Sequence, residues 1–220
     1  YLYVRTPVER ALTAALDQSN AKRILFLCGS SGDGKSEVFR RIHRKYSADF
    51  DFHLDATHSF DPGKNAIQTL DDRFREYKSA ERPLVVGINI GMLGNYEADG
   101  ANEHSDIKDS ISHFLKGETP PNPEFDFINF ESYPKFDLKG RQIEAPFIGP
   151  LLKRICAESN SNPIYAEFLK SDPSTSLHQN FKLLCVPEIQ SRICALLFYA
   201  HLKFDQFLTA RTILDFVFQI

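Results

Sequence analysis

The sequence lacks several features that would assign the protein to a specialised class. No stretch approaches about 18 uncharged apolar residues, so no segment is expected to span a membrane. The formal net charge is only -3, and a chain with so little positive charge makes a poor stand-alone nucleic-acid binder. The four cysteines form no Cys-x-x-Cys pair, and none has a histidine at zinc-finger spacing. No secretory segment, internal repeat or low-complexity tract is evident, so we expect a cytoplasmic protein with reduced thiols.

What is present is typical of a globular protein. The chain has 220 residues, of which 42% are hydrophobic and 25% charged, enough for one α/β domain with a small appended subdomain. It begins at Tyr1 and stops at Ile220, just after an apolar stretch at residues 213–218. A helix cut there would leave apolar surface unburied, and we therefore expect the chain to be part of a longer protein.

Short apolar stretches and helix-length segments alternate over the first two thirds of the chain. Strands are predicted at residues 23–28, 50–55, 83–90 and 125–130. Helices are predicted from Pro7, over residues 37–46, after a cap at Asp61 and after a cap at Ser105. This alternation predicts an α/β fold whose parallel sheet is flanked by helices on both faces.

The apolar spacing becomes helical after about residue 145. Three sets recur at helical spacing: Ile148, Leu151, Leu152 and Ile155; Ile193, Leu196, Leu197 and Ala200; and Leu208, Ile213, Leu214 and Val217. We therefore predict an α/β nucleotide-binding domain at residues 1–145, followed by a small helical lid subdomain at residues 146–220.

One motif carries most of the functional argument. Residues 29–36 match G-x-x-x-x-G-K-[ST] and lie between a predicted buried strand and a predicted helix, as a Walker A loop requires. Such a loop holds phosphates with backbone N–H groups and the positive end of the following helix. Its lysine reaches the β- and γ-phosphates and its final hydroxyl ligates Mg²⁺. We expect ATP, with GTP left open, to contact Gly29, Ser30, Ser31, Gly32, Asp33, Gly34, Lys35 and Ser36.

The acid that would assist hydrolysis is less clearly indicated. Such an acid normally follows a strand next to the loop, where it holds Mg²⁺ or activates water. The candidates are Asp55, Asn89, Asn129 and Glu131. In one assignment Asn89 occupies the position of the acid and Asn129 that of a γ-phosphate sensor, which leaves an amide where a carboxylate is needed. In the other, Asp55 is the acid and Mg²⁺ ligand and Asn89 is the sensor. We favour Asp55, although it could equally cap the turn that follows it.

Several other polar residues have a structural and a functional interpretation. Arg211, at the start of a predicted helix, could reach a γ-phosphate, and Arg154 could be presented to a neighbouring subunit. His53 and His58 lack a third ligand and are interpreted as structural, and Cys28 as a small buried residue. The basic residues Arg40, Arg41, His43, Arg44 and Lys45 are expected to form a solvated helix face rather than a nucleic-acid contact.

A P-loop core followed by a helical lid with an arginine near its last helix resembles the AAA+ branch of P-loop NTPases, including STAND-type proteins. Four segments, at residues 27–36, 53–59, 86–93 and 207–211, more narrowly resemble the DptF family of bacterial DNA-phosphorothioation-dependent restriction proteins. The resemblance implies an N-terminal nucleotide-binding part that acts with sister restriction subunits against unmodified DNA. It also implies that DNA is contacted through the full complex, and that Arg211 is the arginine of the lid.

Two alternatives to a Mg²⁺-dependent ATPase remain. The first is a nucleotide-binding switch or scaffold without turnover, which the amide of Asn89 favours. The second is a small-molecule P-loop kinase. A kinase needs an arginine-rich lid near the phosphates, and Arg141, Lys153 and Arg154 are too scattered to indicate one.

Overall fold

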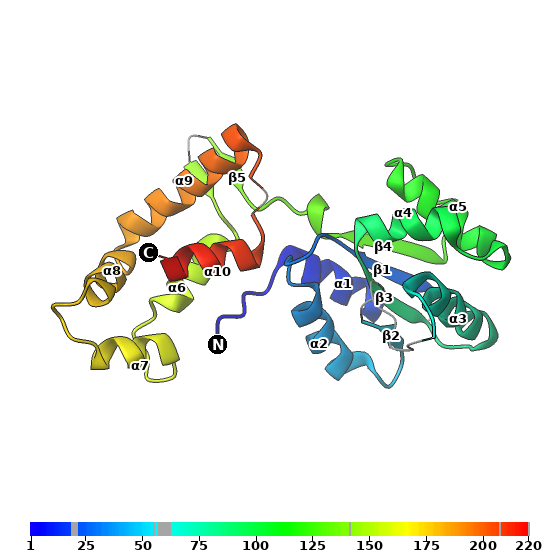
Figure 1. Ribbon diagram of the computed structural model, residues 1–220, viewed down its shortest axis with the longest axis horizontal. Coiled ribbons are helices and arrows are strands. Elements are labelled where there is room, and N and C mark those ends of the chain that lie inside the picture. The colour runs from blue at the N-terminus through cyan, green and yellow to red at the C-terminus, as the bar shows by residue number, and fades with distance from the viewer. Residues whose placement is uncertain (19–21, 55, 57–62, 141, 207, 220) are drawn as a thin grey trace. The chain divides into compact units, whose positions relative to one another are not determined.

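The computed structural model describes the chain apart from residues 19–21, 55, 57–62, 141, 207 and 220 (Figure 1). The chain divides into two compact units. The α/β unit is Pro7–Tyr133, and the helical unit combines Tyr1–Thr6 with Pro134–Ile220. The division therefore falls before the boundary predicted at residue 145, and the first six residues belong with the C-terminal part of the chain.

The α/β unit is built on a parallel sheet of four strands. Their order across the sheet is β2-β3-β1-β4, and every neighbouring pair is parallel. The predicted α/β architecture, a parallel sheet flanked by helices, is confirmed. The strands are β1 (Ile24–Cys28), β2 (Asp51–His53), β3 (Leu84–Ile88) and β4 (Phe125–Asn129). The helices are α1 (Pro7–Asp17), α2 (Lys35–Tyr46), α3 (Ala66–Ser79), α4 (Ile90–Asp99) and α5 (Ser105–Leu115).

The alternating side chains of β1 explain how the helices are distributed over the sheet. Ile24 and Phe26 pack into a core with side chains of α3, α4 and α5. Leu25 and Leu27 point to the other face, where α1 and α2 cover them. All five residues of β1 are buried, as are all five of β3. A strand covered on both faces needs apolar side chains at every position, which is the pattern that the sequence shows there.

Helix boundaries differ from the prediction at three places. The expected strand at residues 83–90 ends at Ile88, and Asn89 caps α4, a helix that the sequence did not predict. The cap of α3 is Asn65, which forms a reciprocal capping box with Gln68, whereas the predicted cap Asp61 lies outside the described residues. Ser105 is the first residue of α5 rather than its cap, and no side chain caps that helix.

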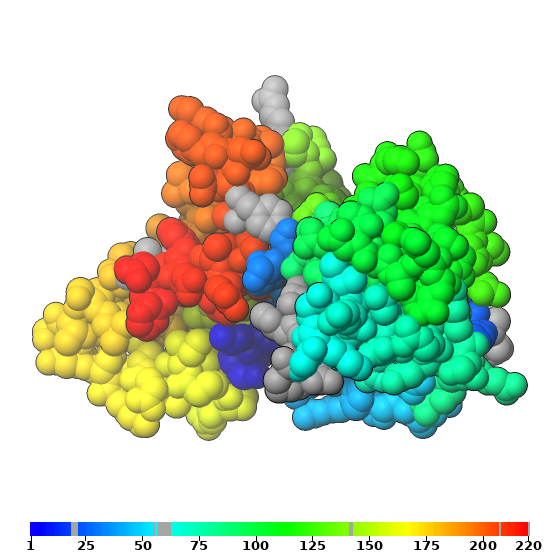
Figure 2. Space-filling model, turned by 45° about the vertical axis from the view of Figure 1, so that its right-hand side comes forward, coloured from blue at the N-terminus to red at the C-terminus, as the bar shows by residue number. Residues whose placement is uncertain are grey.

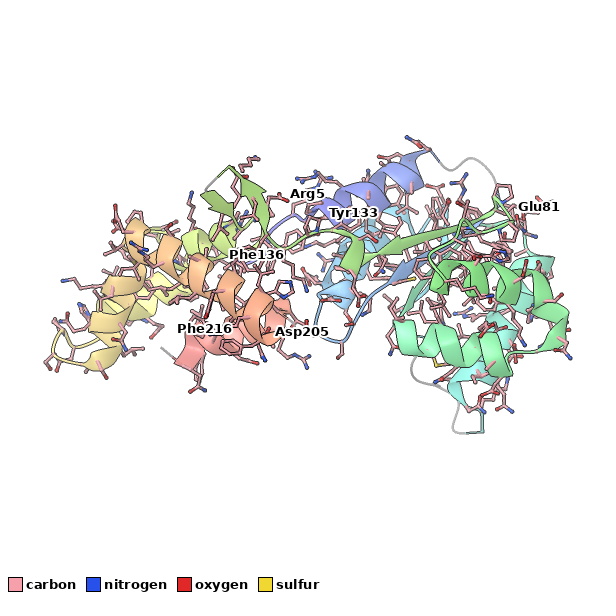
Figure 3. All side chains as sticks on the ribbon, turned by 90° about the horizontal axis from the view of Figure 1, so that it is seen from above. Arg5, Glu81, Tyr133, Phe136, Asp205 and Phe216 are labelled. Atoms are coloured by element: carbon pink, nitrogen blue, oxygen red, sulfur yellow. The ribbon has the colours of Figure 1, made fainter. Side chains whose placement is uncertain are left out.

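The described part of the helical unit contains five helices, of which α6, α9 and α10 lie at the three sets predicted from helical spacing, whereas α7, α8 and a hairpin were not predicted. Strand β6 packs against α9, which places the hairpin with this unit. Phe136, just before the hairpin, lies with its ring centroid 5.3 Å from that of Phe198 on α9 (Figure 3). The elements are β5 (Asp137–Lys139), β6 (Gln142–Glu144), α6 (Ile148–Ile155), α7 (Pro163–Lys170), α8 (Ser176–Leu184), α9 (Pro187–Phe204) and α10 (Ala210–Gln219).

Candidate functional site

The glycine-rich residues 29–36 connect the carboxyl end of β1 to the start of α2. Gly32 and Gly34 have φ angles of 85° and 94°, in the left-handed region that glycine tolerates best. Gly34 is the N-cap of α2, and no side chain caps this helix. The positive end of the α2 dipole is therefore directed at the loop without a capping side chain in between.

Lys35 folds back over the same loop. Its Nζ donates hydrogen bonds to the carbonyl oxygens of Gly29, at 2.8 Å, and Ser30, at 2.6 Å. Ser36, the next residue of α2, is exposed. The ammonium group and the hydroxyl that the sequence assigned to phosphate and Mg²⁺ thus both lie at the loop, one held by main-chain carbonyls and the other open to solvent.

Two carboxylates meet at Ser30. The backbone N–H of Ser30 donates to Oδ2 of Asp33 at 2.7 Å, and its Oγ donates to Oε1 of Glu131 at 3.0 Å. Glu131 lies just beyond β4, so this second bond ties the loop to the neighbouring strand. The sequence did not predict a role for the Asp33 side chain, although Ser30 and Asp33 have the S-x-x-[DE] spacing of a capping box.

The strand ends beside β1 carry Asn89 and Asn129. Cys28, the last residue of β1, is in register with Ile88 on one side and with Asn129 on the other. Both amide side chains bind main chain: Oδ1 of Asn89 accepts from the Met92 N–H at 2.6 Å, and Oδ1 of Asn129 from the Glu131 N–H at 3.0 Å. The structure thus brings both predicted residues to the edge of the loop and gives each a capping role.

The structure does not test the roles predicted for the remaining candidates. Asp55 lies outside the described residues, so its predicted role as the acid stays a prediction. Arg211 is exposed in the first turn of α10, in the helical unit, and its predicted reach to a phosphate is likewise untested. Arg154 donates to the carbonyl oxygen of Tyr1 at 3.2 Å, and the Tyr1 hydroxyl donates to the Arg154 carbonyl at 2.8 Å.

Two basic residues of α2, Arg40 and Arg41, pair with a carboxylate of the same helix, and Lys45 pairs with Asp17 of α1. Glu37 accepts hydrogen bonds from Arg40 and Arg41, each at 2.8 Å at the closest, and the bond from Arg40 is the main reason that the Glu37 pKa is lowered. The His43 ring packs edge-on against Phe52, with 5.0 Å between ring centroids. These contacts agree with the predicted solvated helix face.

Cysteine and histidine side chains in the α/β unit show no catalytic arrangement among the described residues. Cys28 is buried, and its burial raises the pKa of the thiol, which fits the predicted role of a small packing residue. His53 is buried on β2, and His58 is outside the described residues. Within the described part of the chain, no group of three or more His, Cys, Asp or Glu side chains could hold a metal ion.

Comparison of the chain with protein-family models, with curated proteins and with solved structures gives no match. Among the described helices, none alone has the length and apolar composition needed to cross a membrane. Taken together, α8 and α9, which meet at a bend of 85°, satisfy that test of length and composition.

Proposed function

We propose that the α/β unit binds a nucleoside triphosphate, ATP in the first instance and GTP as the alternative, together with Mg²⁺ at residues 29–36. The observation that carries this proposal is the junction of β1 and α2. A fully buried parallel strand leads through two left-handed glycines to a helix that no side chain caps, and Lys35 is the first residue of that helix. This combination presents backbone N–H groups and an ammonium group to an anion.

The sheet topology supports the same location. From β1 the chain passes by way of α2 to the edge strand β2, and it later returns past β1 to β4 at the opposite edge. Helix α2 covers one face, whereas α3, α4 and α5 cover the other. In open parallel sheets, ligands bind beyond the carboxyl ends of the strands where the connections diverge in this way. We further propose that the chain is an AAA+-like P-loop NTPase and that the helical unit acts as its lid.

The residues at the loop have the chemistry needed to hold the metal. A serine hydroxyl and a carboxylate are the hard oxygen ligands that Mg²⁺ prefers, and the bound ion would neutralise phosphate charge. Ser36 supplies the hydroxyl. For the carboxylate we propose Glu131, because it hydrogen-bonds to the loop through Ser30, with Asp55 as the alternative.

A specific observation favours a second function for the same site. Asn89 and Asn129, at the two strand ends beside β1, are amides that accept main-chain N–H groups. Neither can act as a general base. If no carboxylate assists hydrolysis, the unit would be a switch that binds the nucleotide and changes its assembly without turnover.

We also propose that this chain is the nucleotide-binding part of a bacterial DNA-phosphorothioation-dependent restriction component. The support is the resemblance of the four sequence segments, one of which contains residues 29–36. On this proposal the chain works in the cytoplasm with sister restriction subunits, and DNA is contacted through the full complex. The small net charge of -3 agrees with a chain that does not bind DNA by itself.

The test is Mg²⁺-dependent binding and turnover of ATP and GTP by the chain and four variants. Lys35→Ala should lose binding, whereas the control Lys116→Ala should keep it, because Lys116 follows α5 and precedes β4, away from the carboxyl ends of the strands. Glu131→Gln should keep binding and lose turnover. If Asp55→Ala loses turnover instead, Asp55 is the acid. Binding without turnover in the unaltered chain favours the switch, and absence of binding to any nucleotide contradicts the proposal.

A further inference from the structure

Two cysteine side chains meet inside the helical unit. Cys156 is the C-cap of α6 and Cys185 is the C-cap of α8, and both are free thiols. The Cys156 thiol donates to the carbonyl oxygen of Leu184, the residue before Cys185, at 3.4 Å. The Cys185 thiol lies 4.0 Å from the carbonyl oxygen of Cys156. Each sulfur therefore lies against the main chain at the other cysteine, and the two thiols also interact with each other.

The two thiols differ in access and in acidity. Cys156 is buried, at 8% exposure, whereas Cys185 is only partly buried. Burial raises the pKa of both thiols, that of Cys156 to about 12. The hydrogen bond between the thiols adds to the rise in the pKa of Cys156 and opposes the rise in that of Cys185. Cys185 is therefore the sulfur that a small solute reaches and the one that the pair helps to deprotonate.

A buried amide on α9 lies beside the same pair. Nε2 of Gln190 donates to the Leu184 carbonyl oxygen at 3.0 Å, so the amide shares this acceptor with the Cys156 thiol. The Gln190 side chain also hydrogen-bonds to Cys156, and this bond lowers the pKa of that thiol against the larger effect of burial. An N–H at a sulfur favours the thiolate. Negative charge is therefore stabilised on Cys185 by the Cys156 thiol and on Cys156 by Gln190.

We propose that Cys156 and Cys185 are an oxidisable dithiol, which a peroxide converts to a disulfide between the ends of α6 and α8. The Cys185 thiolate attacks one oxygen of hydrogen peroxide, the O–O bond breaks, and a sulfenic acid forms as hydroxide leaves. The Cys156 thiolate then attacks the Cys185 sulfur and displaces the second hydroxide. The two thiol protons convert both hydroxides to water, and the two electrons that the sulfurs lose reduce the peroxide.

The disulfide would close a loop that contains α7 and α8. None of the eight residues of α7 is buried, so little packing holds this part of the helical unit. A crosslink stabilises a protein mainly by restricting its unfolded chain. Oxidation should therefore slow hydrogen exchange of the α7 and α8 amides by roughly tenfold or more. The amides of β1 and β3 should be unchanged, and the inference does not depend on nucleotide binding.

The experiment treats the folded, reduced chain with hydrogen peroxide at about pH 8, near the ordinary cysteine pKa. The unaltered chain should lose about 2 Da, the mass of two hydrogens, and peptide mapping should join Cys156 to Cys185. The matched control Cys194→Ser should do the same, because Cys194 lies in the same core on α9. Cys156→Ser should instead accumulate a Cys185 sulfenic acid that dimedone traps, whereas Cys185→Ser should give no trapped product at the buried Cys156.

The outcomes separate this inference from its alternatives. A disulfide from Cys156 to Cys194, a disulfide between two chains, or oxidation of Cys156 and Cys185 without a link contradicts it. A Cys185 thiol that survives the peroxide also contradicts it. Circular dichroism checks that each reduced variant is folded. If serine at Cys156 unfolds the chain, the peptide maps of the unaltered chain and of Cys194→Ser still decide. None of these results bears on the proposed nucleotide site.

Discussion

The α/β unit and the helical unit contain similar kinds of apolar side chain and bury them very differently. The fully buried aromatic side chains among the described residues, Phe26, Phe39, Phe74 and Tyr96, all belong to the α/β unit, whereas the apolar side chains that the described helical unit fully buries are aliphatic, such as Ile148 and Leu152. Of the sixteen large apolar side chains that are exposed, only Leu54 and Leu115 lie there, and the other fourteen lie in the helical unit. Apolar content alone therefore does not indicate where the core is.

Layering explains the difference. A parallel strand between two helical layers has no exposed face, so each side chain of β1 and β3 is buried. Helix α9 has 18 residues and buries only Gln190, Ile193 and Cys194. Figure 2 shows α9 in orange and α10 in red at the surface, and the exposed side chains there include Leu196, Tyr199, Leu202, Phe204, Leu214, Phe216 and Phe218.

The largest expected change in stability comes from a substitution that leaves a cavity in the core of the α/β unit. Leu70 on α3 is fully buried, at 0% exposure, within the core on one face of the sheet. Leu70→Ala removes three buried carbon atoms and leaves a cavity, and we expect it to reduce the free energy of unfolding of the α/β unit by about 3 kcal/mol. Hydrogen exchange of the β1 and β3 amides measures that loss in the α/β unit separately from the rest of the chain.

Leu202→Ala is the matched control in the helical unit. The Leu202 side chain is 66% exposed, so the same substitution should change stability by less than about 0.5 kcal/mol. A cost at Leu202 equal to that at Leu70 would show that the exposed face of α9 is covered in solution, and the contrast between the units would disappear.

A smaller effect is expected from filling space at a strand glycine. A Cβ atom on Gly87, in β3, would lie 2.7 Å from the carbonyl oxygen of Leu54 and 2.9 Å from the Phe39 ring. Gly87→Ala should therefore destabilise the chain by about 2 kcal/mol, because the main chain beyond β2 has to move. Thermal unfolding followed by circular dichroism measures the change.

Gly149→Ala supplies the comparison from the helical unit. Nothing lies within 4 Å of a Cβ at this position near the start of α6, so alanine should be neutral or stabilising by about 0.5 kcal/mol. Should Gly87→Ala prove as harmless as Gly149→Ala, the packing between β3 and the segment after β2 is looser than the structure shows.

The elements that sequence reasoning predicted are those in which a single pattern decides the structure. The continuous apolar stretch of β1 and the helical spacing of α2 each have one interpretation. Helix α4 was missed because the apolar run of β3 continues through Ile90 and because two glycines, Gly91 and Gly94, weaken the helical signal. Strands β5 and β6 were missed because they have three residues each and Leu138 is 63% exposed, so no alternation of burial marks them.

In the candidate site, too, the features set by local chemistry were predicted from the sequence and those set by strand order were not. The conformation of residues 29–36 follows from local chemistry, since only glycine adopts the backbone angles of Gly32 and Gly34 without strain, and the sequence therefore predicted the loop. The bond between Ser30 and Glu131 joins residues 101 positions apart. It exists because β4 lies beside β1, and no spacing in the sequence encodes that strand order. Asn89 was assigned a catalytic or sensor role because a polar residue after a strand has the same appearance whether it meets a ligand or caps a helix.

The smallest effect concerns a buried histidine of the α/β unit. His104 is 1% exposed, its Nε2 lies 3.1 Å from the Asp71 carbonyl oxygen, and its Nδ1 has no hydrogen-bond partner among the described residues. Burial, assisted by the positive charge of Lys78, lowers the His104 pKa below its ordinary value. The neutral ring is therefore favoured in the folded state, and its contribution to stability is complete above about pH 6.5, the ordinary histidine pKa. That contribution is lost as the pH falls from there toward the lowered pKa, at no more than about 1.4 kcal/mol per pH unit.

His104→Gln should flatten this acid dependence, because glutamine can still donate to the Asp71 carbonyl but does not take up a proton. The measurement is the free energy of unfolding of the α/β unit, obtained from hydrogen exchange of the β1 and β3 amides. It is repeated at pH values between about 7.5 and about 5, a range that brackets the ordinary histidine pKa of about 6.5. The matched control is His201→Gln, since His201 lies on α9 in the helical unit and its ring is not fully buried. If the His104 variant retains the full slope between about pH 6.5 and about pH 5, the burial of His104 does not cause the acid dependence of the α/β unit, and the prediction is wrong.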